Sequence, residues 1–232
     1  MSAPIGNTLD TTRTSGIIFD LDGTLIDSYD AIGASLNHAL TRLGRSPLPT
    51  DPIRKMVGRG LEVLIARALE REGAGPDAEV VEAVALFREH YDRTCVAATR
   101  LLPDVETTLR SLHKRGYRMG VATNKPSYFA RRLLDALGVG DLIPAIYGPD
   151  LVSHHKPHPE MVHRLLAAMG LTAPETIYVG DMEVDVETAR AAGVRVVVMP
   201  TGSSTVAALH AARPDLVVAG FSALLDLLPA RC

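Results

Sequence analysis

Short runs of β-branched and apolar residues alternate with amphipathic helical segments through the second half of this chain. The runs lie at 117–123, 142–148, 176–181, 194–200 and 215–220. The helical segments lie at 103–116, 127–138, 158–170 and 184–193, and each ends on a glycine, the residue that most often follows a helix. Continuous apolar strands separated by helices are typical of a parallel sheet covered on both faces. The pattern therefore predicts an α/β fold with helices on both sides of the sheet.

The N-terminal stretch GIIFDLDGTLIDS (16–28) departs from this pattern, because its apolar run ends on two aspartates, Asp20 and Asp22. Asp-Gly between apolar residues is a strong turn signal, so one interpretation is a β-hairpin. The other interpretation is a buried strand with a charged site at its end. Taken alone, the stretch is compatible with both.

The residues that follow this stretch carry helical periodicity and no convincing strand. The helical segments are SYDAIGASLNHALTRLG, DPIRKMVGRGLEVLIARALEREG and DAEVVEAVALFREHYDRTCVAA. Such a block, inserted after the first strand, has the pattern of a separate all-helical cap. We therefore expect an α/β core made of residues 1–27 and 102–232, a helical cap over 28–101, and hinges near Ser28 and Leu102.

The amino-acid composition limits the kinds of binding partner and the cellular compartment that we expect. Hydrophobic residues make up 47% of the 232 residues, and the formal net charge is −3, which gives no electrostatic case for nucleic acid or an anionic membrane as partner. No apolar run approaches the roughly 20 residues that a membrane span requires, and the N-terminal segment lacks the apolar stretch of a signal peptide. Two cysteines, Cys95 and Cys232, cannot form a disulfide framework. We therefore expect reduced thiols and a cytoplasmic protein.

Polar and charged side chains follow three of the apolar runs at the points where those runs end, and a lysine precedes a helix. They are Asp20 and Asp22 after the first run, Thr123 and Asn124 after GVA, Asp181 and Asp185 after IYVG, and Lys156 in SHHKPHPE. Ligands of an open parallel sheet bind beyond the carboxyl ends of its strands. We therefore expect these side chains to converge on one edge of the sheet.

Such a set of side chains suits phosphoryl transfer to a carboxylate. A carboxylate can act as a nucleophile and form an acyl phosphate, which divides hydrolysis into two easier steps. Because the attacked phosphate is itself anionic, its charge has to be neutralised. Several carboxylates together can hold Mg²⁺, a lysine adds a second positive charge, and a hydroxyl with backbone N–H groups binds the remaining oxygens. The residues therefore predict Mg²⁺ as the cofactor.

Four motifs, in this order along the chain, resemble those of the haloacid dehalogenase superfamily of phosphatases: DLDGTLIDS, VATNK, Lys156 in HHKPHPE, and VGDMEVDVETA. The resemblance extends over nearly the whole chain. It implies a Rossmann-like core with a helical cap inserted after the first strand. With all four motifs in order, the charged site at a strand end is preferred over the hairpin for residues 16–28.

The resemblance also implies a role for each motif residue. It implies that Asp20 is the nucleophile and Asp22 the general acid/base. It implies that Mg²⁺ is held by the Asp20 side chain, the Asp22 backbone carbonyl and Asp181, with Asp185 behind the metal. Thr123, Asn124 and Lys156 would hold the phosphoryl group.

Within this resemblance, we expect hydrolysis of a small phosphate monoester, with 2-phosphoglycolate as the preferred substrate. The segment KMVGRGLEV (55–63) is similar to a cap loop of the phosphoglycolate phosphatase branch that reaches the active site, so Arg59 is a candidate for substrate binding. True dehalogenases lack an acid at the position of Asp22, which argues against that activity. Sugar-phosphate phosphatases and β-phosphoglucomutase-like phosphomutases keep both aspartates and remain alternatives.

Two further interpretations are less favoured. A receiver-type phospho-switch also combines carboxylates, Mg²⁺, Thr and Lys on an α/β core, but it lacks a large cap. A zinc site at His154, His155 and His158 is not expected, because adjacent histidines in an extended loop point apart and no Cys or His at ligand spacing follows.

Overall fold

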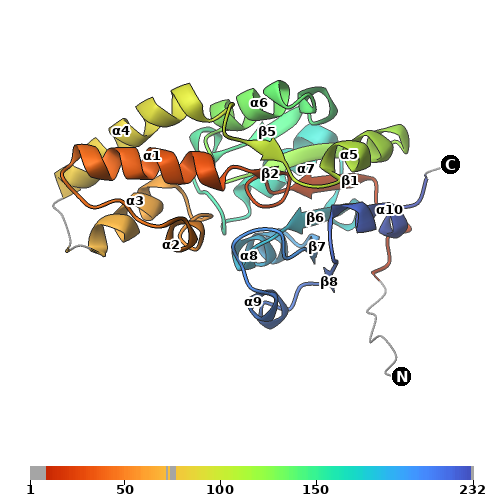
Figure 1. The fold of residues 1–232 in the computed structure, drawn as a ribbon. Coiled ribbons are helices and arrows are strands. Elements are labelled where there is room, and N and C mark those ends of the chain that lie inside the picture. Colours follow the sequence, from red (N-terminus) through yellow and green to blue (C-terminus); the bar gives the residue numbers. More distant parts are fainter. Residues whose placement is uncertain (1–8, 72, 74–76, 231–232) are drawn as a thin grey trace, which may run out of the picture.

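The computed structural model describes residues 9–71, 73 and 77–230, and within them a parallel sheet of six strands forms the centre of the molecule (Figure 1). The strand order is β5-β4-β1-β6-β7-β8. The strands are β1 (Gly16–Phe19), β4 (Arg118–Ala122), β5 (Ala145–Tyr147), β6 (Thr176–Gly180), β7 (Arg195–Val198) and β8 (Leu216–Val217). Each lies within a run expected from the sequence, and all pair in parallel. The predicted α/β fold is confirmed.

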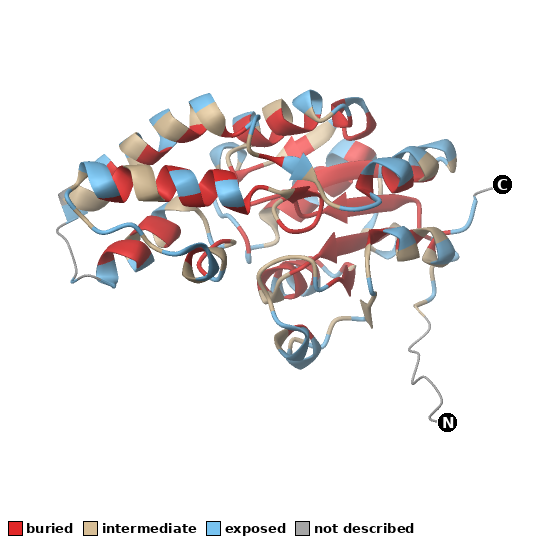
Figure 2. Cartoon of the chain, in the orientation of Figure 1, coloured by how far each residue is buried: buried red, intermediate tan, exposed pale blue. Residues whose placement is uncertain are grey.

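Helices cover both faces of the sheet because alternate strand residues face opposite sides. Ile17 and Phe19 of β1 belong to one buried cluster, together with residues of α5 (Val105–Lys114), α6 (Ser127–Ala136) and α10 (Leu224–Leu227). Ile18 belongs to a second cluster with residues of α7 (Glu160–Met169), α8 (Glu183–Ala191) and α9 (Val206–Ala211). The strands are buried along most of their length (Figure 2). Short 3-10 helices cover Gly140–Leu142, Pro149–Leu151, Ala173–Glu175 and Phe221–Ala223.

The glycines expected to end the core helices do so. Gly116, Gly138, Gly170 and Gly193 follow α5, α6, α7 and α8, with φ angles of 83°, 74°, 61° and 69°. These angles lie in the left-handed region that a residue after a helix commonly adopts. Each helix therefore ends where its glycine predicts.

Along the chain, helices α1 to α4 come after β1 and before β4. In space they extend beyond the carboxyl end of the sheet (Figure 1). They are α1 (Tyr29–Arg42), α2 (Thr50–Arg54), α3 (Leu61–Glu70) and α4 (Asp77–Thr94), and we call them the cap. Two short strands that sequence analysis missed, β2 (Ile26–Asp27) and β3 (Arg100–Leu101), pair antiparallel where the chain enters and leaves the cap. Each has only two residues, too few for a periodicity to show.

Two further sequence features can be located. Cys95 is a buried free thiol, whereas Cys232 lies outside the described residues. No helix in the described part of the chain has the length and apolarity needed to cross a membrane.

Candidate active site

The strand order brings the predicted residues to one edge of the sheet. β1 lies between β4 and β6, and the chain progresses outward from β1 in both directions, so β1 marks the point where the strand order reverses. Crevices at such a point are the usual ligand sites of open α/β sheets. Asp20, Thr123 and Asp181 each follow one of these three strands directly. Phe19 pairs in register with Val121 and Val179, which places the three strand ends side by side.

The Asp-Gly turn exists, but it does not make a hairpin of β1. β1 pairs in parallel with β4 and β6, and the chain then turns through Gly23, whose φ is 89° and whose N–H donates to the Ile26 carbonyl (2.8 Å). A Cβ atom at Gly23 would lie 2.6 Å from Oδ2 of Asp181. Glycine is therefore required both by the turn and by the close approach of the turn to the acidic site.

Three carboxylates and one ammonium group form the buried centre of the site. Oxygen atoms of Asp20, Asp181 and Asp185 lie within 4.8 Å of one another, and all three side chains are buried. Nζ of Lys156, also buried, donates to Oδ1 of Asp20 and Oδ1 of Asp185 at 2.8 Å each. In their ordinary charge states these groups leave two negative charges uncompensated, which is the charge that a divalent cation supplies.

Asp181 provides the sharpest indication of a cation. Its Oδ1 accepts a hydrogen bond from Thr24 Oγ1 (2.6 Å), but its Oδ2 is buried and has no hydrogen-bond partner. An unpartnered buried carboxylate oxygen is costly unless something positive meets it. Hard oxygen ligands suit Mg²⁺, so the residues fit the metal that the sequence predicts.

The electrostatics of the acids agree with this interpretation. Burial raises the pKa of Asp20 to about 7, against the attraction of Lys156. Burial, together with the charges of Asp185 and Asp20, raises the pKa of Asp181 well above its usual value. Burial alone would lower the pKa of Lys156, but Asp185 and Asp20 more than offset that and raise it, so the lysine stays charged. The acids therefore need a further positive charge to be ionised together at neutral pH.

Asp185 has a different set of contacts from Asp181, because its two oxygens are fully used within the protein. Oδ1 accepts from Lys156 Nζ (2.8 Å) and the Tyr178 hydroxyl (3.2 Å). Oδ2 accepts from the backbone N–H groups of Asp181 (3.1 Å) and Met182 (3.0 Å). Asp185 thus holds Lys156 and the backbone of Asp181 in place; that it lies behind a bound metal stays a prediction.

Asp22 lines a cavity between the core and the cap together with Asp20, Thr123 and Asn124. Its Oδ1 accepts a short hydrogen bond from Ser28 Oγ and forms an ion pair with Lys125 Nζ (3.1 Å). Asp20 and Asp22 therefore face the same space, as expected, even though Asp22 lies in the turn and not in the strand.

Asn124 joins three parts of the site. Its Nδ2 donates to the carbonyls of Lys156 (3.2 Å) and of Gly58 in the cap (2.9 Å), and its Oδ1 accepts from the Lys156 N–H (3.0 Å). Both amide hydrogens are thus used within the protein. Thr123 lines the cavity, and its Oγ1 accepts from the backbone N–H of Lys125 (3.1 Å). That these two residues hold a phosphoryl group stays a prediction.

Arg59 is the one predicted site residue that the structure brings neither to this cavity nor to the buried centre formed by Asp20, Lys156, Asp181 and Asp185. Its side chain is exposed and lines two neighbouring hollows, one beside His155 and the other beside Met182. The glycine that precedes it, Gly58, does line the cavity. The cap loop thus reaches the site with its backbone, whereas the arginine points elsewhere.

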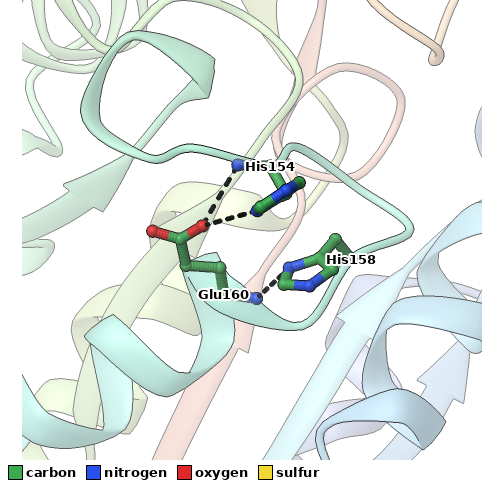
Figure 3. Close-up of side chains that lie close together, drawn as sticks. All are labelled: His154, His158 and Glu160. Atoms are coloured by element: carbon green, nitrogen blue, oxygen red, sulfur yellow. Dashed lines mark hydrogen bonds and ion pairs between the residues drawn. The ribbon is translucent and has the colours of Figure 1, made fainter.

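A second cluster of possible metal ligands lies in the loop before α7 (Figure 3). The rings of His154 and His158, which are not adjacent in the chain, lie 4.4 Å apart. However, His158 Nδ1 accepts from the backbone N–H of Glu160 (3.3 Å). Oε2 of Glu160 accepts from the backbone N–H groups of Ser153 and His154, and Oε1 accepts from Arg164. These contacts use Nδ1 of His158 and both carboxylate oxygens of Glu160 and stabilise the loop. That no zinc binds here stays a prediction.

Sequence analysis missed Thr24, Lys125 and Tyr178, which contact Asp181, Asp22 and Asp185 respectively. Thr24 and Lys125 lie inside motifs that were already singled out. Tyr178 was detectable as a residue with a polar hydroxyl in a continuous apolar strand, since a buried hydroxyl needs a hydrogen-bond partner.

Comparison with known proteins agrees with this geometry. Residues 17–199 match the family described as haloacid dehalogenase-like hydrolase. The chain is 39% identical over 215 residues to a phosphoglycolate phosphatase of Cereibacter sphaeroides, covering 92% of this chain and 95% of that protein. It is 36% identical to a phosphoglycolate phosphatase of Pectobacterium atrosepticum, covering 94% and 93%.

A crystal structure of a predicted phosphoglycolate phosphatase from Haemophilus somnus superimposes with a TM-score of 0.88 at 29% identity, covering 93% of this chain and 98% of that one. The family match spans the cap and all positions from Asp20 to Asp185 in the core. The chain therefore belongs to the haloacid dehalogenase-like hydrolase family, and it is a phosphatase that acts on phosphoric monoesters.

Proposed function

We propose that the protein hydrolyses a small phosphate monoester, 2-phosphoglycolate first among them, in a Mg²⁺-dependent reaction through an aspartyl phosphate on Asp20. The observation that carries this proposal is the unpartnered Oδ2 of Asp181 beside Asp20, within a buried cluster that lacks two positive charges. Mg²⁺ would be held by the side chains of Asp20 and Asp181 and by the backbone carbonyl of Asp22. When bound, it would neutralise charge as nucleophile and phosphate approach.

Asp20 would attack the phosphorus through one of its two carboxylate oxygens. Its Oδ1 accepts from Lys156, so Oδ2 forms the bond to phosphorus while the ester oxygen leaves. Asp22 gives its proton to that leaving oxygen. In the second step Asp22 takes a proton from water, the water oxygen bonds to phosphorus, and the bond from phosphorus to Asp20 breaks. Inorganic phosphate and the free alcohol are the products.

The substrate assignment rests on the named relatives and on the cavity lining. The cap and α6 line the cavity with large apolar side chains, namely Ile32, Val57, Leu61, Leu64, Phe87 and Phe129. A sugar phosphate would place several hydroxyl groups against these apolar side chains, and buried hydroxyls without partners are costly. A small substrate without hydroxyl groups avoids that cost, but its carboxylate needs a positive partner, for which Arg59 is the candidate in the cap; the choice of phosphoglycolate over the sugar phosphatase and phosphomutase alternatives therefore rests mainly on the named relatives.

A panel of phosphate monoesters tests the proposal by kcat/KM, with 2-phosphoglycolate expected first. A hexose phosphate ranked first, or a product still phosphorylated at another carbon, would favour the alternatives. Long retention of the phosphate on the protein would instead favour a receiver-type switch.

Arg59 requires a separate test, because it would reach a substrate carboxylate only after a further movement of the cap. If it does so during turnover, Arg59→Ala lowers kcat/KM for 2-phosphoglycolate by roughly 10- to 100-fold and barely changes that for p-nitrophenyl phosphate, which has no carboxylate. Equal effects on both substrates would exclude a role in carboxylate recognition.

A further inference from the structure

Lys125 connects the core, the cap and Asp22 through one buried ammonium group. It follows β4 and Asn124, and its Nζ lies 3.1 Å from Oδ1 of Asp22. The same Nζ donates to the hydroxyl of Tyr91 on cap helix α4 (2.8 Å) and lies 4.7 Å from the centre of the Tyr91 ring. Among the described residues that line the cavity, Lys125 is the only one with a cationic side chain.

Electrostatics keep this group charged and paired. Burial alone would lower the pKa of Lys125, but Asp22 and Tyr91 more than offset that and raise it. Burial raises the pKa of Tyr91 to about 12, so its hydroxyl stays protonated. A buried ammonium that loses a partner becomes costly. Lys125 therefore holds Asp22 and Tyr91 at defined positions.

Tyr91 is itself a fixed point on the cap. Its ring stacks on Phe87 of the same helix (5.4 Å between centroids) and meets the edge of Phe129 on core helix α6 (5.1 Å). The phenol is therefore aimed at Lys125 by packing from both the cap and the core. If α4 moved away from the core, the hydroxyl would leave Lys125.

We propose that Lys125 is a positioning residue through which the seating of the cap, sensed at Tyr91, orients the carboxylate of Asp22 for proton transfer. This inference rests on the proposed function, in which Asp22 is the general acid/base. Lys125 and Ser28 both contact Oδ1 of Asp22, which leaves Oδ2 for the leaving-group oxygen. Closure of the cap over the substrate would thus also orient the Asp22 carboxyl group.

The test compares Tyr91→Phe with wild type on phenyl phosphate and p-nitrophenyl phosphate. These esters are similar in shape, but phenolate is the more basic leaving group and depends more on an acid. Loss of the Tyr91 hydroxyl should lower kcat/KM, which covers the steps up to departure of the leaving group, by about tenfold for phenyl phosphate and by less than about twofold for p-nitrophenyl phosphate. Lys125→Met should produce a still larger difference between the losses for phenyl phosphate and p-nitrophenyl phosphate.

Tyr128→Phe is a matched control. The hydroxyl of Tyr128 on α6 also donates across the core–cap boundary, to Asp92 of α4 (3.3 Å), but it contacts neither Lys125 nor Asp22. This variant should keep the wild-type ratio of the two kcat/KM values. A similar change of the ratio in Tyr128→Phe would show a general effect of cap contacts and would overturn the proposal.

A double-mutant cycle separates positioning of Asp22 from a general structural role. In an Asp22→Asn background, Tyr91→Phe should have no further effect on either ester. A further loss in that background, or equal losses on both esters in the single variant, would overturn the proposal while hydrolysis itself continued. Hydrolysis of neither ester by the wild-type protein in Mg²⁺ would instead refute the proposed function.

Discussion

A Cβ atom at Gly202 would lie 1.5 Å from Oδ2 of Asp181, the carboxylate oxygen that has no partner in the protein. Gly202 lies in the loop after β7, and its carbonyl accepts from Arg54 of cap helix α2 (3.2 Å). The loop after β7 therefore forms one wall of the acidic site and is tied to the cap.

Gly202→Ala is expected to raise the Mg²⁺ concentration needed for half-maximal activity, because the added methyl group displaces the Asp181 carboxylate. A Mg²⁺ titration of phosphatase activity measures the change. Gly220→Ala is the control, since a Cβ there would meet nothing within 4 Å. An unchanged Mg²⁺ requirement in Gly202→Ala would show that Asp181 does not hold the metal.

Asp20→Asn is expected to leave the fold intact and to lower turnover of p-nitrophenyl phosphate by several orders of magnitude, because an amide is a poor nucleophile. Steady-state rates measure the loss, and circular dichroism checks the fold. Wild-type turnover in this variant would exclude Asp20 as the nucleophile.

Substitutions of Asp181 and Asp185 are expected to differ in their effects on the stability of the protein and on its response to Mg²⁺. Asp185→Ala removes one of the two carboxylate partners of buried Lys156 and the acceptor of the backbone N–H groups of Asp181 and Met182, so it should destabilise the protein by about 3–5 kcal/mol in urea unfolding. Asp181→Asn removes a charge from a crowded cluster, so in EDTA it should be at least as stable as wild type. Because Asp181 would hold the metal, Mg²⁺ should raise the Tm of the wild type but not that of Asp181→Asn.

The opposite pattern, with a Mg²⁺-dependent Tm retained in Asp181→Asn and lost in a folded Asp185 variant, would exchange the roles of the two residues. Asp185→Asn keeps the shape of the side chain and serves if Asp185→Ala does not fold.

The stability of the cap is expected to depend on pH through His90. Its Nδ1 lies 3.0 Å from Ser35 Oγ of α1, and its ring stacks on His38 at 4.5 Å. Burial, then the charges of His38 and Arg93, lower the pKa of His90 below its ordinary 6.5. As pH falls, the unfolded chain therefore binds the proton first, and stability present above about pH 6.5 is lost.

Urea unfolding at about pH 8 and about pH 5 measures this effect. As the pH is lowered from about 8 to about 5, the free energy of unfolding should fall less in His90→Gln than in wild type. His163→Gln, at an exposed position on α7, should behave as wild type. Equal pH dependence in His90→Gln and wild type would exclude His90 as a contributor.

Much of the architecture follows from local rules that a sequence displays. Apolar runs between helices that end on Gly116, Gly138, Gly170 and Gly193 determine the parallel sheet, because burial and helix termination act over short stretches. The order of the motifs likewise determines that Asp20 and Asp181 meet, since parallel strands bring their carboxyl ends to one edge.

The partners within the site were decided by the tertiary structure. Whether a cation on a loop meets substrate, solvent or another side chain depends on the seating of the cap on the core. Arg59 was the candidate from the cap and points away from the cavity, while Lys125 of the core reaches Tyr91, 34 residues earlier in the chain. Such contacts join segments far apart in the chain, so no local pattern specifies them, and packing of Tyr91 against Phe87 and Phe129 sets their geometry.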